Sequence, residues 1–259
     1  ENVTLKMSKK QAKDIVFKNV SFEYDQTGIK IFNSFNLKIE EGKTIGIVGK
    51  VGSGKTSILD LICRIYDPSS GDIFIGDKNL KSLELNELRK NISYVTQNNF
   101  LFSESIQKNI EFGNPNATKD EVKQAAILAE IDSEILKFKK GYETILGERG
   151  VTLSGGQVQR LSIARSFIKD SEIYLFDDCF SSLDSDTEDR IIKNLNNNFK
   201  DKTLLIVSHR VSCVKNADKI IVLENGRIIQ DGTHTDLINI KGFYKDCLLY
   251  TSPSPRDPE

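Results

Sequence analysis

The feature that most constrains this chain is a glycine-rich segment, GKVGSGKT, at residues 49–56. It follows an apolar run, KTIGIV, that predicts a buried strand at 43–48, and it leads into a helical pattern at 55–65. Glycines let the backbone curl so that successive N–H groups point into one concavity, and the helix adds its positive end. The alternative is an ordinary glycine-rich turn between a strand and a helix, but such a turn does not require a lysine and a threonine directly after the last glycine. The segment therefore predicts a site for the phosphates of a nucleoside triphosphate.

The side chains of this segment suit that task. The Lys55 ammonium can reach the β- and γ-phosphates, and the Thr56 hydroxyl is a natural ligand for Mg²⁺. The residues expected to bind the nucleotide here are Gly49, Val51, Gly52, Ser53, Gly54, Lys55, Thr56 and Ser57.

Two adjacent acids, Asp177 and Asp178, follow another apolar run, Ile173 to Phe176, in the strand expected at 172–177. A carboxylate at the tip of a parallel strand, here Asp177, is well placed to hold Mg²⁺ beside a phosphate. Asp178 would lie closer to the group under attack. If it activates a water, its reach matters, because Asp is one methylene shorter than Glu.

The order of the elements predicts an α/β fold with a P-loop NTPase core. Strands are expected near 15–22, 31–39, 43–48, 72–75, 92–96, 172–177, 203–208, 219–223 and 227–230. Helices are expected at 55–65, 104–110, 119–130, 155–168, 186–197 and 234–239. Their alternation indicates a mainly parallel sheet, and the early strands joined by short turns indicate an antiparallel β patch. The stretch 98–160 is poor in strands and predicts a helical subdomain.

Bulk composition excludes several classes of protein. With 36 basic and 37 acidic residues, the net charge of -1 does not favour nucleic acid as a partner. No apolar run approaches the roughly 18 residues of a membrane span, so the sequence predicts a soluble chain. The cysteines are widely spaced, which is typical of reduced, buried thiols; they are Cys63, Cys179, Cys213 and Cys247.

Both ends differ from the rest of the chain in residue composition and periodicity. Residues 1–13 are polar and without a strong period, as expected of a linker. Residues 247–257, CLLYTSPSPRD, resemble the in-frame translation of a transposon-type sequencing adapter. The segment 247–259 is therefore expected to be an unstructured read-through tail, with a flexible proline-rich C-terminus as the alternative.

A second motif, LSGGQVQR at 153–160, opens an amphipathic helix and would present bare N–H groups to an anion. A glycine-rich helix cap can be merely structural. Together with the phosphate loop, however, this string resembles the signature of ATP-binding-cassette (ABC) ATPases, over roughly residues 14–246. In that family two cassettes pack head to tail, and each signature completes the partner's ATP site. The signature residues are Leu153, Ser154, Gly155, Gly156 and Gln157.

The resemblance implies ATP and Mg²⁺ as ligands and gives roles to residues outside the two motifs. They are Tyr24 stacked on adenine, Gln97 at the Mg²⁺ and the water, Asp177 and Thr56 at the Mg²⁺, His209 at the γ-phosphate, and Ser182 and Asp184 in the loop that crosses the dimer. Each residue also has a structural explanation when taken alone. Tyr24 could be a core or edge aromatic residue, Gln97 a surface amide, and His209 the cap of the helix that follows.

Two further segments are similar to those of exporter-type cassettes: Glu148 to Gly150 before the signature, and SIQKNIEFG at 105–113. In exporters these segments meet the cytoplasmic loops of a membrane domain. The resemblance therefore implies a transmembrane domain preceding residues 1–13 and a place at the cytoplasmic face of the cell membrane. An importer ATPase subunit and a soluble, non-transport ABC ATPase are the alternatives.

Asp178 departs from the family, which usually has Glu at this position. A shorter carboxylate predicts a site that binds ATP tightly and hydrolyses it slowly. Since the signature is intact, the pattern is similar to one half of a heterodimeric exporter whose partner carries the Glu. The alternative is a tolerated variant in a homodimer, which the retained His209 favours.

Overall fold

The computed structural model describes residues 13–147 and 150–251, which form two compact units. The first unit is built from the residues up to Leu88 and from Leu205 onward, and the second from Arg89–Leu204. The chain passes between the units at α2 (Leu85–Lys90) and at β8 (Thr203–Val207). Among the described residues, no helix is both long and apolar enough to cross a bilayer.

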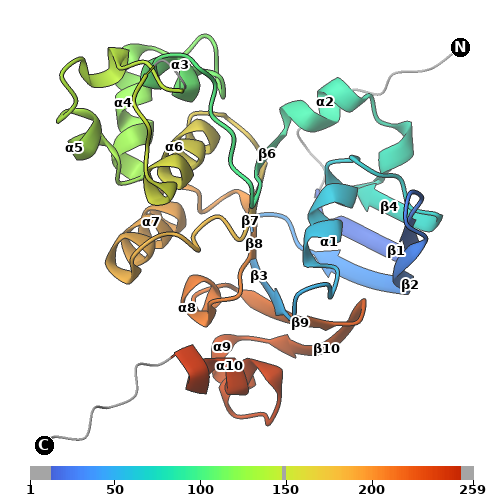
Figure 1. The fold of residues 1–259 in the computed structure, drawn as a ribbon. Coiled ribbons are helices and arrows are strands. Elements are labelled where there is room, and N and C mark those ends of the chain that lie inside the picture. Colours follow the sequence, from blue (N-terminus) through green and yellow to red (C-terminus); the bar gives the residue numbers. More distant parts are fainter. Residues whose placement is uncertain (1–12, 148–149, 252–259) are drawn as a thin grey trace, which may run out of the picture. The chain divides into compact units, whose positions relative to one another are not determined.

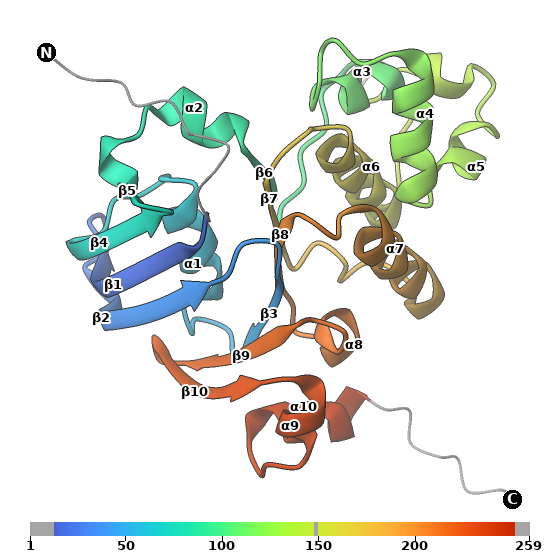
Figure 2. The ribbon, with the colours of Figure 1, turned by 180° about the vertical axis from the view of Figure 1, so that it is seen from behind.

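The first unit contains an antiparallel sheet with the strand order β2-β1-β4-β5 (Figures 1 and 2). Its strands are β1 (Ile15–Tyr24), β2 (Ile29–Ile39), β4 (Ser70–Ile75) and β5 (Lys78–Asn79). Ile15 lies opposite Ile39 on one side and Ile75 on the other, and all three side chains are buried. The apolar alternation of these strands therefore faces one core, and the expected antiparallel patch is confirmed.

Three further strands of the first unit include the one that leads into the glycine-rich segment. β3 (Thr44–Gly49) pairs in parallel with β9 (Lys219–Glu224), and β9 pairs antiparallel with β10 (Arg227–Gly232). Residues 45–49 are all buried, as a strand covered on both faces requires. The helices and 3₁₀ turn of this unit are α1 (Lys55–Ile62), η1 (Leu80–Ser82), α8 (Val211–Val214), α9 (His234–Ile238) and α10 (Phe243–Thr251).

α10 corrects the expectation for the C-terminal segment. The sequence predicted no structure from residue 247 onward, yet residues 247–251 continue the helix that begins at Phe243. Cys247 and Leu248 are half-buried one helical turn after Phe243 and Tyr244, so they extend the face that packs inward. Residues 252–259 of the expected tail, and 1–12 of the expected linker, lie outside the described residues.

The second unit combines a parallel strand pair with a helical part. β6 (Ile92–Val95) pairs in parallel with β7 (Ile173–Asp177), in the register Ile92 opposite Ile173. The helices and 3₁₀ turn are α3 (Ile106–Glu111), α4 (Lys119–Leu128), α5 (Asp132–Ile135), η2 (Gly141–Glu143), α6 (Gly155–Phe167) and α7 (Ser185–Asn198). α4 packs beside α6 (Figures 1 and 2). Residues 98–160 contribute α3, α4, α5, η2, the whole signature and the first part of α6.

The structure contains every strand and helix that the patterns predicted, and the parallel pairs confirm the α/β class. Apart from α10, the patterns missed only short elements, namely α2, α5, α8, β5, η1 and η2. These elements are too short to show a period, and in such segments packing against the rest of the unit decides the backbone conformation.

Candidate nucleotide-binding site

The glycine-rich segment forms the loop between β3 and α1 in the first unit. Gly54 caps α1 with a left-handed backbone at φ 102°, and a Cβ there would lie 2.7 Å from Ile31 and 3.0 Å from Phe32. A Cβ on Gly49 would lie 2.1 Å from the Leu223 carbonyl oxygen of β9. Only glycine fits both positions, so the loop is held close to its neighbours.

Lys55 lies at the centre of this loop. Its ammonium donates to the carbonyl oxygens of Gly49 and Lys50, both at 2.8 Å, and the residue is buried. Thr56 is exposed in the first turn of α1, and the Ser53 hydroxyl is buried with no hydrogen-bond partner among the described residues. A buried donor without a partner is costly, and phosphate oxygens would satisfy it. These residues fit a nucleotide phosphate with Mg²⁺ at Thr56.

Two further predicted residues belong to the same unit. Tyr24 ends β1, and its hydroxyl lies 2.9 Å from the Ser57 hydroxyl of α1. His209 follows β8 and is exposed, directly after Ser208, whose N–H donates to the Ile47 carbonyl of β3 at 3.2 Å. The first unit therefore brings Tyr24 to the phosphate loop and anchors the chain next to His209 on the strand that carries the loop.

The two acids lie in the second unit at the end of β7. Asp177 and Asp178 are both buried, with exposed fractions of 3% and 8%. Asp178 has a left-handed backbone at φ 45°, and its carbonyl accepts the Ser181 hydroxyl at 3.0 Å. Asp tolerates the left-handed region better than most residues with a side chain. The turn therefore gives this position a backbone reason to be Asp that the sequence pattern did not reveal.

The signature begins α6 with a reciprocal cap. The Ser154 hydroxyl accepts the Gln157 N–H at 3.3 Å, and the Gln157 side chain accepts the Ser154 N–H at 2.9 Å. Gln157 also donates to Glu134 at 2.8 Å, and Arg160 pairs with the same carboxylate at 2.7 Å. Burial raises the pKa of Glu134, but the bonds from Gln157 and Arg160 outweigh it and hold the pKa below its usual value. This network fixes the start of the signature helix.

Gln159 is a site residue that the sequence analysis missed. Its side chain accepts the Ser182 N–H at 3.0 Å and donates to the Ser181 hydroxyl at 3.3 Å. It therefore ties the signature helix to the loop after β7, within the same unit. The signal was present, since Gln159 belongs to the LSGGQVQR string. Asp184 in turn caps α7 by accepting the Thr187 N–H at 2.9 Å, a bond that lowers its pKa.

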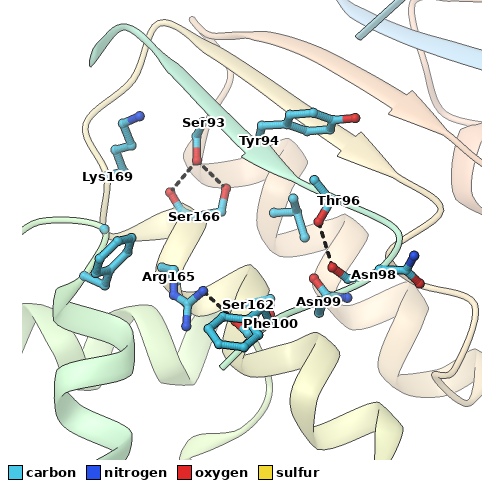
Figure 3. A pocket seen from close by; sticks show the side chains of 13 residues that line it. Ser93, Tyr94, Thr96, Asn98, Asn99, Phe100, Ser162, Arg165, Ser166 and Lys169 are labelled. Carbon is cyan, nitrogen blue, oxygen red and sulfur yellow. Dashed lines mark hydrogen bonds between the residues drawn. The ribbon is translucent and has the colours of Figure 1, made fainter. Parts of the chain in front are cut away.

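Gln97 is exposed just after β6. Its chain neighbours Thr96 and Asn98 line a cavity of about 310 Å³ in the second unit (Figure 3). Arg165 of α6 reaches into this cavity and donates to the Phe100 carbonyl at 2.9 Å, the Asn109 carbonyl at 2.8 Å and the Asn109 side chain at 3.0 Å. Its guanidinium lies over the ring of Phe112, which is exposed, and burial lowers the Arg165 pKa. Ser162 lines the same cavity, and its buried hydroxyl has no hydrogen-bond partner among the described residues.

Comparison with known proteins settles the family. The model of the ABC transporter family matches residues 32–181. The chain belongs to this family. It is 42% identical over 231 residues to a putative multidrug export ATP-binding/permease protein of Bacillus subtilis, covering 89% of this chain and 40% of that protein. A protein of the same description from Staphylococcus aureus is 45% identical over 227 residues, covering 88% and 39%.

The structural comparison agrees with the sequence comparison. The fold matches a bacterial Atm1-family ABC exporter with ATP bound at a TM-score of 0.91 and 32% identity, covering 99% of this chain and 45% of that one. The chain therefore has the fold of an ABC ATP-binding domain, as its motifs predicted. It spans about two-fifths of the length of the curated relatives it matches.

Proposed function

We propose that the chain is the ATPase domain of an ABC exporter, acting in a head-to-tail pair of cassettes. The observation that carries this proposal is that one chain builds both parts of a shared site. The phosphate loop with Lys55 supplies one side, and the capped helix start at Ser154 supplies the other. The printed names of the relatives, which combine export, ATP binding and a permease, support the exporter branch over an importer subunit or a soluble ATPase.

The residues divide the work as follows. Tyr24 stacks on the base, the loop N–H groups and Lys55 bind the phosphates, and the signature of the partner cassette covers the γ-phosphate. Thr56, Asp177 and Gln97 would hold Mg²⁺, which would neutralise charge on the phosphates. Asp178 orients the attacking water, and His209 contacts the γ-phosphate. Ser182 and Asp184 lie in the loop at the partner's signature.

We further propose that this chain's own site turns over slowly. Asp178 replaces the usual Glu, and a carboxylate withdrawn by about 1 Å from its productive place costs on the order of 10²-fold in rate. The intact signature then serves a partner chain that carries Glu. A homodimer in which Asp178 works well enough is the alternative, and rates measured in the presence of a Glu-bearing cassette separate the two.

The cavity beside Gln97 is the proposed docking site for the exporter's membrane domain, at the cytoplasmic face of the membrane. The exposed Phe112 ring and the Arg165 guanidinium over it together offer apolar contact and hydrogen bonding. β6 lines this cavity, and Gln97 follows β6 directly. A movement of Gln97 at the nucleotide would therefore reach the cavity through a short segment.

Turnover of ATP is expected to rise with protein concentration, because each site needs the signature of a second cassette. The measurement is phosphate release per molecule over a wide concentration range, alongside equilibrium ATP binding at low concentration. Ser154→Ala should remove the rise and leave ATP binding by the monomer intact. A rate per molecule that does not depend on concentration would contradict the paired-cassette mechanism.

Arg165→Lys is expected to lower the free energy of unfolding by about 2 kcal/mol, because an ammonium cannot reproduce the fork that joins Phe100 and Asn109. Urea unfolding measures the loss. Arg227→Lys is the matched control, since Arg227 is exposed on β10. Equal stability of the two variants would show that Arg165 does not organise the cavity.

A further inference from the structure

Tyr24 lies in a cluster of three aromatic rings in the first unit. Its ring centroid is 4.9 Å from that of Phe22 and 5.2 Å from that of Tyr66, and both contacts are edge-to-face. Phe22 and Tyr66 are in contact as well, at 5.6 Å. Edge-to-face contact is one of the favoured arrangements of aromatic pairs, so the cluster supports the Tyr24 ring through its edges.

The hydroxyl group of Tyr24 adds a directional constraint. It lies 2.9 Å from the Ser57 hydroxyl, and Ser57 is 3% exposed. Ser57 belongs to the first turns of α1, directly after Lys55 and Thr56. The bond therefore ties the ring expected to stack on adenine to the helix whose start binds the phosphates.

The chemistry of two hydroxyls allows this bond to persist when a nucleotide is bound. A serine hydroxyl has one donor and two acceptor positions. When the Tyr24 hydroxyl donates to the Ser57 oxygen, the Ser57 hydrogen stays available for a phosphate oxygen. One side chain can then hold the aromatic ring and a phosphate at the same time.

We propose that Ser57 is a positioning residue for Tyr24, so that one side chain serves both base recognition and phosphate recognition. The inference rests on the proposed function, in which Tyr24 stacks on the base of ATP. It goes further by assigning a task to the tyrosine hydroxyl, which stacking alone does not use. Phenylalanine would stack equally well but could not be held by Ser57.

The test is a double-mutant cycle on equilibrium binding, with ATP and inorganic tripolyphosphate as the ligands. Tyr24→Phe is expected to weaken ATP binding about two- to tenfold, the size of one hydrogen bond, and to leave tripolyphosphate binding unchanged. Ser57→Ala weakens both ligands. The double variant should bind ATP no more weakly than Ser57→Ala alone, because the same bond is already lost.

Two further variants keep the outcome decisive. In Ser57→Thr the hydroxyl is retained, so adding Tyr24→Phe should again weaken ATP binding. Tyr66→Phe is the matched control, because it removes a hydroxyl from the same ring cluster that makes no hydrogen bond with the described residues. Thermal unfolding of each variant without ligand shows that the domain remains folded.

The failures of the two proposals are distinguishable. If Tyr24→Ala leaves ATP affinity unchanged, the ring does not bind the base and the proposed site is wrong there. If Tyr24→Ala weakens ATP binding but Tyr24→Phe does not, only the positioning role of Ser57 is overturned. Independent, multiplicative losses in the double variant, or an equal loss of tripolyphosphate binding in Tyr24→Phe, would overturn it too.

Discussion

Asp178→Glu is expected to raise the rate of ATP hydrolysis at this chain's own site by about 10²-fold. The longer side chain extends the carboxylate by one methylene, and displacement of a reacting group by about 1 Å costs on the order of that factor. ATP affinity should change little, since the groups that bind the phosphates are elsewhere. The measurement is single-turnover hydrolysis with saturating ATP, at a protein concentration that favours paired cassettes.

The structure also predicts a cost of this substitution. The backbone at position 178 is left-handed, at φ 45°, a conformation that Glu adopts less readily than Asp. The variant should therefore lose about 1 kcal/mol or less of unfolding free energy while gaining rate. Asp178→Asn is the matched control, because it keeps the shape and removes the charge. If Asp178→Glu brings no gain and Asp178→Asn loses the rate of the parent protein, Asp178 is itself a competent catalytic carboxylate.

Lys55→Ala is expected to weaken ATP binding by about 10- to 10²-fold and to reduce hydrolysis to background. The ammonium is the charged donor at the centre of the loop, and a hydrogen bond from a charged group contributes about 1.5–3 kcal/mol. Equilibrium binding of ATP measures the first effect and phosphate release the second. Lys55→Arg should not restore binding, because a planar fork does not fit a pocket shaped around a point charge.

Lys50→Ala provides the comparison for this experiment. Lys50 belongs to the same loop, but its side chain points to solvent and pairs with Glu224 at 2.9 Å. Its removal should change ATP affinity less than about threefold, because an exposed ion pair contributes little. Retention of ATP affinity by Lys55→Ala would show that the loop does not bind phosphate in the manner proposed.

Much of this protein could be read from local sequence. The phosphate loop and the signature are contiguous strings, and their chemistry depends on glycine backbone freedom and on the start of the helix that follows. Residues 45–48 and the run before Asp177 are uninterrupted apolar stretches because β3 and β7 are buried on both faces. Local patterns of this kind survive in any fold that contains them, so the sequence by itself determined the α/β class and the type of ligand.

The tertiary structure decided what depends on residues far apart in the chain. The bond between Tyr24 and Ser57, the link from Gln159 to Ser182, and the hold of Arg165 on Phe100 each join separate elements. Hydrophobic periodicity places a residue inside or outside, but it does not state which partner a polar group will meet. The left-handed backbone at Asp178 was likewise visible only in the structure, because the sequence pattern before it predicts a strand and not the turn that follows.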